Sequence, residues 1–586
     1  MRVPVVFLAL AALLCACCPS PRLRGEGGAQ RRVRGRAVAR WTPPHPPSGH
    51  LLPRAAGEKG NIRRALLIGI DDYTASTLPR VGPVDPGRER GWPDLKGAAN
   101  DVDLLAELLL RYGFERQNIV VLKNQQATRA AILRSLEHLA RESRKGDIAF
   151  YYFAGHGAQV PNPASDELDR LDESIVPADS RRGAKDIRDK ELRPLFNRIL
   201  GAGAHLTLLL DHCHSGSGFR GRPRRGIGPG PPVMDGRDYG PRPDERGALV
   251  LAATQDLDPA WETKGEDGLM HGWFTWSWIR ALCDAAAGEP AQETFLRAQA
   301  RLRAEAPYQA PAMLGSAEAR LRPFLDTHRG HDRRMVAVEK VTADGEVVLQ
   351  GGWANGLAAG SELRAAGTRL RITNILGVSR SVAVEDRQSC LSGPRDRQDC
   401  LSSTAVRSGA LLEIVSPRND AWYDLESPHP PAPYGLNVRH EATGKFVRGI
   451  VAGGETYTIV LRASGAAEIT PRYYYVFVVD SVGKSHLLFP RGGSVENRFP
   501  IGAPDAEIPL GRPSAFRVTP PYGLDTYYLL STEEPLPNPS VLEWDGVRAG
   551  RALRATRWSI ERITLESVRP GGGRSATRRS SGVPSR

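Results

Sequence analysis

The sequence of 586 residues lacks any apolar stretch long enough to cross a membrane comfortably. Its longest one, Val3 to Leu14, has twelve residues, whereas a transmembrane helix needs about 20. Hydrophobic residues make up 41% of the chain and the mean hydropathy is −0.35, so apolar residues are ample but dispersed. These values exclude an integral membrane protein and a wholly disordered one. The length predicts three or four domains.

Acidic residues are too few to balance the basic ones. The chain has 66 Asp and Glu against 79 Lys and Arg, a net charge of +13, which is typical of proteins that bind nucleic acid or acidic membranes. The surplus is concentrated in residues 20–60, 218–247 and 568–586, which hold seven, three and five excess positive charges. These segments are rich in Gly, Pro and Ser, and we interpret them as linkers or tails. The remainder is close to neutral, so we expect no nucleic-acid partner.

The N-terminus has the features of an export signal. Met1 and Arg2 precede the apolar stretch, and the sequence LCACC at 14–18 is similar to a bacterial lipobox. Cys17 fits best as the lipidated residue; the alternative is an ordinary cleaved signal. We therefore predict a signal peptide over 1–17, a Pro- and Arg-rich linker over 18–61, and an exported protein. We expect a bacterial lipoprotein of the periplasm or the outer membrane, attached to the membrane only through its lipid. The alternative is a secreted protein.

Cysteine is rare in the rest of the chain, where only four residues occur. Cys390 and Cys400 lie in two similar heptads, DRQSCLS and DRQDCLS, and export to an oxidising compartment favours a disulfide between them. Cys283 lies in an apolar helical pattern, so we expect a buried thiol. Cys213 stands alone in a loop-like context and is the candidate for chemistry.

Strand and helix patterns alternate from residue 62 to about 325. Short apolar runs that predict strands lie at 65–70, 119–122, 148–153, 206–210 and 249–253. Helical spacing of apolar residues follows the first two of them. This alternation predicts an α/β fold with a doubly wound, mostly parallel sheet covered on both faces. In such folds the active site forms beyond the carboxyl ends of the strands, where His156 and Cys213 occur.

The residues around these two positions suit nucleophilic catalysis. A cysteine attacks a carbonyl as a thiolate, and an imidazole can remove and return the proton. Glycines flank His156 on both sides, so backbone N–H groups there can approach an oxyanion. A histidine and a cysteine at the ends of two strands therefore indicate covalent cysteine catalysis.

Residues 151–159 (YYFAGHGAQ) and 211–216 (DHCHSG) resemble the two catalytic motifs of the metacaspase-like branch of caspase-fold cysteine peptidases, family C14 of clan CD. Further similar segments lie at 64–70, 95–102, 248–253 and 271–275, so the resemblance covers roughly 62–325. It implies a caspase-like domain in which Cys213 is the nucleophile and His156 the general acid/base. The backbone N–H groups of Gly157 and Cys213 would form the oxyanion hole.

By the same resemblance, Asp101 and Asp211 match the acids of the pocket that binds the residue before the cleaved bond, the S1 pocket. Carboxylates in a pocket pair with Arg or Lys, so we expect cleavage of protein or peptide substrates after basic residues. In the alternative interpretation, Asp101 caps a helix and Asp211 binds backbone. Ala154 stands where the family usually has a serine.

No metal or other cofactor is expected. Calcium-activated metacaspases use an acidic pair, but Asp189 is followed here by Lys190, and Arg220 stands in the downstream stretch. These cations should oppose Ca²⁺ binding. We interpret the acidic run over 166–173 as a solvated loop; the alternative is that it holds a cation. His212 and His214 would point away from Cys213 in an extended segment, which argues against zinc.

Residues 220–246 are predicted to form an exposed loop, which in this fold is often a processing site. A protease specific for basic residues could cleave its own seven arginines there; the alternative is a plain flexible insertion. Beyond it, 333–416 predict a small β domain. Residues 430–540 resemble a β-sandwich module often appended to bacterial caspase-like proteins, and 568–586 predict a disordered basic tail.

Two functions fit the sequence. The first is a cysteine endopeptidase with a Cys213–His156 dyad and an acyl-enzyme intermediate. The alternative is a catalytically silent caspase-fold scaffold or binding protein of the cell envelope. The retained His156 and Cys213 favour the enzyme, whereas Ala154 and the replaced calcium ligands keep the scaffold open.

Overall fold

A computed structural model describes residues 61–569 with internal gaps. The gaps are 75–77, 84–91, 166–169, 214–224, 255–258, 307–308, 332, 366–367, 377–378, 386–405, 417–432, 448, 464–470, 482–483, 491–496, 501–506, 511–514, 534, 537–538 and 544–557. The predicted signal peptide with Cys17, all but the last residue of the linker, the Cys390–Cys400 pair and all but the first two residues of the basic tail lie outside the described residues.

A six-stranded sheet with the strand order β11-β8-β7-β3-β1-β2 forms the centre of the first domain. Its strands are β1 (Arg63–Gly69), β2 (Ile119–Lys123), β3 (Ile148–Ala154), β7 (His205–Asp211), β8 (Leu249–Ala252) and β11 (Ala312–Leu314). The first five run parallel, and only β11 pairs antiparallel, with β8. The prediction of a mostly parallel sheet is thus confirmed.

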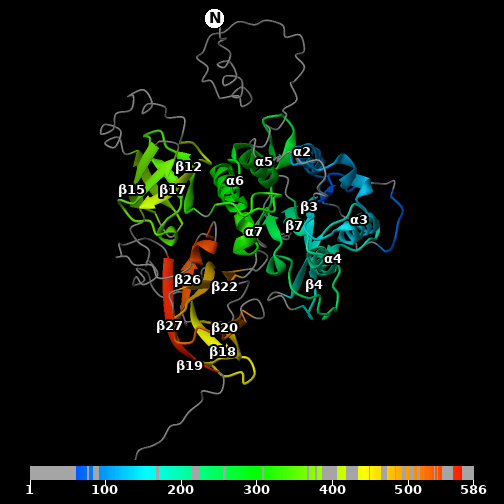
Figure 1. The fold of residues 1–586 in the computed structure, drawn as a ribbon. Helices are drawn as coiled ribbons and strands as arrows, with labels where there is room; N and C mark the ends of the chain where they lie inside the picture. Colours follow the sequence, from blue (N-terminus) through cyan, green and yellow to red (C-terminus); the bar gives the residue numbers. More distant parts are fainter. Residues whose placement is uncertain are drawn as a thin grey trace, which may run out of the picture.

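Helices cover both faces of this sheet (Figure 1). They are α2 (Ala98–Arg111), α3 (Arg129–Glu142), α4 (Asp189–Gly201), α5 (Trp273–Asp284), α6 (Ala291–Glu305) and α7 (Ala317–Leu321). In β1, Ala65 and Leu67 pack into the core with α2, α5 and α6. Leu66 and Ile68 pack into the opposite core with α3 and α4. Burial on both faces explains why these strands are almost continuously apolar.

Two small sheets flank the carboxyl ends of the central strands. One consists of β4 (Gly157–Pro161), β5 (Leu171–Ile175) and β6 (Ile187–Arg188), and the other of β9 (Glu262–Lys264) and β10 (Met270–Gly272). The predicted solvated acidic run is in part wrong, because Asp172 and Glu173 lie in β5 and are buried. Asp172 is held there by cationic partners, which offset the cost of burying its charge.

The second domain is a closed barrel of short strands. Around the barrel they follow the order β12-β13-β16-β15-β14-β17. The strands are β12 (Met335–Val341), β13 (Val347–Gln350), β14 (Glu362–Ala365), β15 (Thr368–Ile375), β16 (Ser381–Glu385) and β17 (Leu411–Ser416). Alternate side chains such as Val336, Val338 and Leu349 fill the interior, as the period of two in a strand requires.

The third domain packs two sheets face to face around an apolar core. One sheet contains β18 (Tyr434–His440), β20 (Thr456–Ala463), β24 (Glu507–Pro509) and β25 (Phe516–Arg517). The other contains β19 (Ile450–Ala452), β21 (Arg472–Val479), β22 (Ser485–Phe489), β23 (Arg498–Phe499), β26 (Leu524–Thr532) and β27 (Trp558–Val568). A strand-rich C-terminal part agrees with the prediction, but the predicted end of the sandwich at residue 540 is wrong, because β27 lies beyond it and pairs with β26 and β19.

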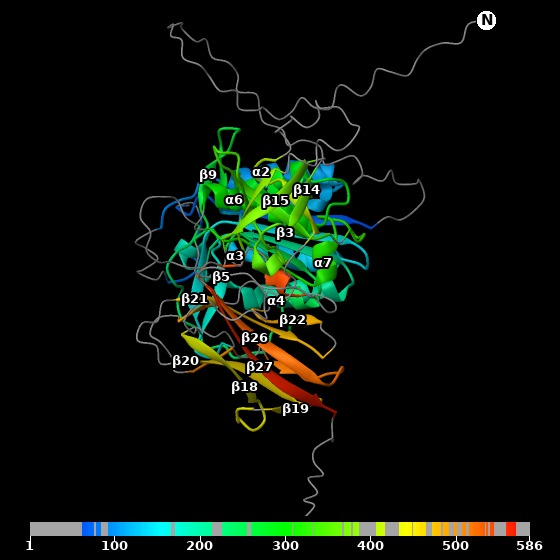
Figure 2. The same cartoon turned by 90° about the vertical axis from the view of Figure 1, so that its left-hand side faces the viewer.

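The three domains contact one another. Helix α6 lies between the central sheet and the barrel strand β12 (Figure 1). The outer face of β21 and β26 packs against Ala354 and Ala358 of the barrel domain. Figure 2, turned so that the barrel faces the viewer, shows the sandwich strands β18 to β27 below the other two domains. No helix in the described part of the chain is long and apolar enough to span a membrane.

Candidate active site

The two predicted catalytic residues follow neighbouring strands. Strands β3 and β7 pair in parallel register, with Ala154 opposite Asp211 at their carboxyl ends. His156 and Cys213 each lie two residues beyond this pair, so the chain brings them to the same edge of the sheet. Both side chains are fully buried. Cys283 is also a thiol but lies half-buried in α5, not fully buried as predicted.

His156 is held in one orientation by a backbone carbonyl and two aromatic rings. Its Nε2 lies 2.8 Å from the carbonyl oxygen of Pro93, which can only accept, so Nε2 carries the proton. This leaves Nδ1 as the nitrogen that can take a proton from a nucleophile. The His156 backbone N–H donates to the hydroxyl of Tyr73 at 2.7 Å, and the Tyr73 ring lies 4.8 Å from the imidazole. A fixed tautomer suits a general acid/base.

The predicted oxyanion hole is occupied by the chain itself. The backbone N–H groups of Gly157 and Cys213 both donate to the carbonyl oxygen of Arg225, each at 3.0 Å. These are the two groups that the sequence assigns to an oxyanion. Two such donors polarise the carbonyl group of Arg225.

The side chain of Arg225 enters an acidic pocket. Its Nη2 lies 2.8 Å from Asp101 and 3.3 Å from Glu262, and its Nη1 lies 3.2 Å from the carboxylate of Asp211. All four side chains are fully buried. The structure therefore brings the two predicted S1 acids together around one guanidinium. The expectation of an exposed loop over 220–246 is wrong for Arg225.

Each of the three carboxylates is fixed by further hydrogen bonds. Asp101 accepts from the Gly272 N–H at 2.9 Å, and its other oxygen lies 2.9 Å from Nδ1 of His271. Asp211 accepts from the hydroxyl of Thr275 at 2.5 Å and from its N–H at 3.1 Å. The alternative that Asp101 caps a helix is wrong, because Asp101 lies inside the first turn of α2 and the N-cap is Gly97. The backbone contact of Asp211 does occur, to the Thr275 N–H, and coexists with the pocket.

Burial and mutual charge shift the pKa values in this pocket. Burial raises the pKa of Asp211 and of Glu262 above their ordinary values, although the nearby Arg225 opposes the rise. Burial alone would lower the pKa of Arg225, but Asp211, Asp101 and Glu262 raise it well above its ordinary value. The guanidinium is thus the cation that offsets three buried acids.

Sequence reasoning missed two members of the pocket. Glu262 is in β9, far along the chain from the catalytic motifs, and no local pattern marks it. Arg225 is one of seven arginines in a segment that reads as a linker. The one sequence feature that indicates this contact is the excess of arginine in that segment, combined with the predicted acidic pocket of Asp101 and Asp211.

The residues after Arg225 run beside β4 and are hydrogen-bonded to it. The N–H groups of Ile227, Gly230 and Val233 donate to the carbonyls of Gly157, Gln159 and Pro161 at 2.8–3.0 Å. These bonds advance three residues along the segment for every two along β4, so the segment follows the strand edge without forming a regular strand, and among its described residues only Gly226 makes a β-bridge, to Gly157. The described part of the Arg-rich segment is therefore ordered against the domain.

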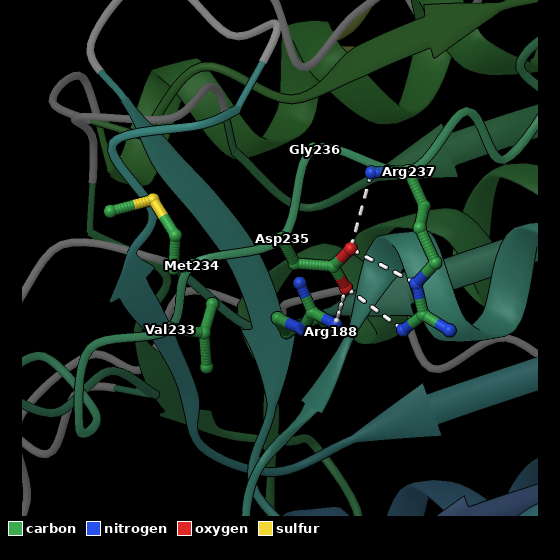
Figure 3. A pocket seen from close by; sticks show the side chains of 6 residues that line it. All are labelled: Arg188, Val233, Met234, Asp235, Gly236 and Arg237. Carbon is green, nitrogen blue, oxygen red and sulfur yellow. Dashed lines mark hydrogen bonds and ion pairs between the residues drawn. The ribbon is translucent and has the colours of Figure 1, made fainter.

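A cluster of ion pairs around Asp235 holds the end of this segment against Arg188 (Figure 3). The Asp235 carboxylate lies between Arg188 and Arg237, with its Oδ2 at 2.7 Å from the Arg188 guanidinium, and it accepts from the Tyr239 hydroxyl at 2.6 Å. Hydrogen bonds from Arg237, Tyr239 and Arg188 hold its pKa well below the ordinary value. An open pocket of about 620 Å³ lies here, lined by Arg188 and residues 233–237. It contains none of the residues around Cys213.

Cations also lie beside the residues considered for calcium. Lys190 Nζ is 2.9 Å from Asp172 and 2.6 Å from the Ser165 hydroxyl, and Arg188 lies 2.8 Å from the same carboxylate. Among the described residues no group of three or more His, Cys, Asp or Glu side chains is placed to hold a metal. His212 packs against the ring of Phe153, with centroids 5.4 Å apart.

The first domain is similar in sequence to known proteins. Residues 62–321 match the sequence model of the caspase domain. Metacaspase-1 of Coccidioides immitis (strain RS) is 34% identical over 191 residues, 30% of this chain and 38% of that protein. Metacaspase-1B of Aspergillus fumigatus (strain CBS 144.89 / FGSC A1163 / CEA10) is 36% identical over 163 residues, 26% of this chain and 36% of that protein. The chain thus spans less than half the length of these relatives.

A solved structure, protein GSU0716 from Geobacter sulfurreducens, aligns with 46% of this chain and all of its own. Its TM-score is 0.35 and its sequence identity 22%, values too low to indicate a shared fold. The family match, in contrast, covers the whole central sheet and both flanking layers of helices. Residues 62–321 are therefore a caspase domain, followed in this chain by additional strand-rich domains.

Proposed function

We propose that the protein is a cysteine endopeptidase that cleaves after Arg or Lys through Cys213 and His156. The observation that carries this proposal is Arg225, whose side chain lies among three carboxylates while its carbonyl accepts from the predicted oxyanion-hole N–H groups. A residue immediately before a cleaved bond must have its side chain in the specificity pocket and its carbonyl oxygen in the oxyanion hole. Arg225 meets both requirements of this proposal. The metacaspase relatives support the cysteine peptidase class.

The proposed reaction has two steps. The Cys213 thiol loses its proton to Nδ1 of His156, and the sulfur attacks the carbonyl carbon of the residue in the acidic pocket. The negative charge on its oxygen is stabilised by the N–H groups of Gly157 and Cys213. His156 then gives the proton to the leaving amine and a thioester remains. Water, activated by His156, hydrolyses this acyl-enzyme and restores the thiol.

The first substrate in this proposal is the protein's own chain. Attack on Arg225 would break the Arg225–Gly226 bond and leave a carboxylate on Arg225 and an amine on Gly226. Before cleavage the same residue occupies the pocket, so it also acts as an inhibitor in cis. Substrates in trans would be protein or peptide segments with basic residues.

Neither calcium nor another metal is required in this proposal. The ammonium of Lys190 and the guanidinium of Arg188 already neutralise Asp172, so a hard cation would meet positive charge there. We further propose that the protein is exported and anchored through Cys17, or secreted, and that Cys390 and Cys400 form a disulfide. The C-terminal β domains would then bind partners or substrates in the envelope.

Fluorogenic peptides with Arg or Lys before the reporter test this function. Wild-type protein and Cys213→Ala would be purified as the full exported chain and incubated with the peptides, with Ca²⁺ and with a chelator. We expect hydrolysis by the wild type only, at the same rate in both buffers. Equal rates for wild type and Cys213→Ala, or no hydrolysis of any basic peptide, would favour the silent scaffold. Activity that depends on Ca²⁺ would refute the metal-free part alone.

A further inference from the structure

We propose that Arg181 is a positioning residue for catalysis, because it fixes the Pro93 carbonyl that in turn holds His156. This inference rests on the proposed function, since it concerns the acid/base of the proposed reaction. Arg181 lies in η3 (Ser180–Arg182), a short 3₁₀ helix that follows β5, and its side chain is half-buried. It acts on the imidazole only through the residues between them.

The Pro93 carbonyl lies in a segment that packing does not hold. Residues 92–95 form no helix or strand, and Pro93 and Asp94 are exposed. The Pro93 oxygen nevertheless lies 2.8 Å from Nε2 of His156, the contact that fixes the tautomer. A proline has no backbone N–H that could anchor it. The position of this oxygen therefore depends on how the neighbouring residues are held.

The Arg181 guanidinium contacts the residue before Pro93 at two places. Its Nη2 donates to the carbonyl oxygen of Trp92, and its Cζ lies 4.5 Å from the centroid of the Trp92 ring. Tryptophan is the aromatic residue that attracts a cation most strongly. The Trp92 carbonyl shares a planar peptide unit with the Pro93 nitrogen, and the proline ring restricts φ to about −65°. Once this peptide unit is fixed, only the ψ angle of Pro93 remains to orient its carbonyl.

The Trp92 ring also links Arg181 to the imidazole. Its centroid lies 6.4 Å from that of His156, edge to face at 85°, and 6.0 Å from that of Tyr73. On the other side of Pro93, Asp94 accepts from the Tyr73 N–H at 3.0 Å. The segment that orients His156 is thus held from both sides, and Arg181 supplies the contacts on the Trp92 side.

The same 3₁₀ helix provides a matched control. Nε of Arg182 donates to the carbonyl oxygen of Leu78 at 2.9 Å, and the Arg182 carbonyl accepts from the Val81 N–H at 2.8 Å. Arg182 therefore anchors an earlier part of the connection between β1 and α2. Substitution of its side chain removes that anchor but leaves the one at Trp92 in place.

The first test measures self-cleavage, in which Arg225 already lies in the pocket and no binding step intervenes. Full chains of the wild type, Arg181→Met, Arg181→Lys and Arg182→Met would be made by cell-free synthesis, and the fraction cut after Arg225 would be followed with time. We expect Arg181→Met to cleave about 10- to 100-fold more slowly, part of the roughly 100- to 10,000-fold that a positioned acid/base contributes. Arg182→Met should cleave at the wild-type rate. Arg181→Lys keeps the charge but not the planar stack, so it should stay slow.

A second test needs no catalysis. In the Cys213→Ala background, NMR of isotope-labelled histidine reports which imidazole nitrogen of His156 carries the proton, and His156→Gln assigns the signal. We expect a protected Nε2–H signal in this background and with Arg182→Met added. Arg181→Met should lose that signal or show both tautomers, whereas the signals of the other histidines should remain dispersed as in a folded protein.

The outcomes separate the two proposals. Absence of self-cleavage in the wild type would refute the proposed function and leave the histidine spectra to decide the role of Arg181. An Arg181→Met protein that cleaves as fast as Arg182→Met, or that keeps the Nε2–H signal, would overturn the inference. So would full recovery of the rate in Arg181→Lys, because charge alone would then be sufficient.

Discussion

Removal of the Arg225 side chain should destabilise the caspase domain strongly. In the Cys213→Ala background, where no self-cleavage can occur, Arg225→Ala leaves Asp101, Asp211 and Glu262 buried without their cation. Loss of one partner of a buried ion pair costs about 3–5 kcal/mol. At about 2–4 °C per kcal/mol for a domain of this size, the Tm should fall by roughly 6–20 °C.

Calorimetric unfolding at several pH values measures this effect, with Arg237→Ala as the control. Arg237 lies in the same segment, but its side chain is 73% exposed, so its removal should change stability little. Burial raises the pKa of Asp211 and Glu262. As the pH falls, these two carboxylates are therefore protonated in the folded protein at a higher pH than in the unfolded chain. Because they are charged near pH 7, the loss of stability caused by Arg225→Ala should be largest there. It should shrink towards pH of about 4, where the same groups titrate in the unfolded chain.

Two results would refute this reasoning. If Arg225→Ala and Arg237→Ala unfold within about 1 °C of each other at pH 7, the guanidinium does not offset the buried acids. If the Arg225→Ala penalty grows as the pH falls, the acids are not the groups that need the cation. Either result would also remove the main support for an arginine pocket.

Three other changes test separate parts of the site. Gly272→Ala should abolish processing in an incubation assay, since a Cβ there would lie 2.1 Å from a pocket carboxylate and 2.5 Å from the Arg225 guanidinium; normal cleavage would contradict the pocket. Burial lowers the pKa of His271 but hydrogen bonds to two acids raise it overall. Protonated His271 should therefore contribute its full stabilisation of the folded protein below pH of about 6.5, and this contribution should be lost as the pH rises through the raised pKa. If His271→Gln has the same dependence of Tm on pH as the wild type, this prediction is wrong. Asp235→Ala should speed limited proteolysis of the segment after Arg225, because Arg188 no longer holds that segment by an ion pair; Asp238→Ala is the control, and equal rates in the two variants would contradict this role of Asp235.

Local patterns predicted the central sheet and the catalytic pair because both depend on short stretches of sequence. The buried strands are continuous apolar runs, and Thr128 begins α3 by accepting from the Ala131 N–H, as a helix cap does. His156 and Cys213 stand directly after two such strands, and a parallel register brings them to one edge. Their positions at one edge therefore follow from the parallel order of the strands, which the pattern of apolar runs indicates.

The sequence did not predict which residues complete the pocket. Arg225 lies among Gly and Pro, a composition typical of linkers, and its burial depends on three acids from distant parts of the chain. Asp172 was placed in a solvated loop because its neighbours are acidic, whereas its cationic partners lie in β6 and α4. In both cases a charge is buried by long-range pairing, which composition cannot reveal.

The central claim is that Arg225 is bound as a substrate of Cys213. Its most direct test is the intact mass and N-terminal sequence of fragments from purified wild type and Cys213→Ala after incubation. The wild type should yield a fragment that begins at Gly226, and Cys213→Ala should remain whole at that bond. Fragments that begin at Gly226 in both proteins, or in neither, would contradict the claim.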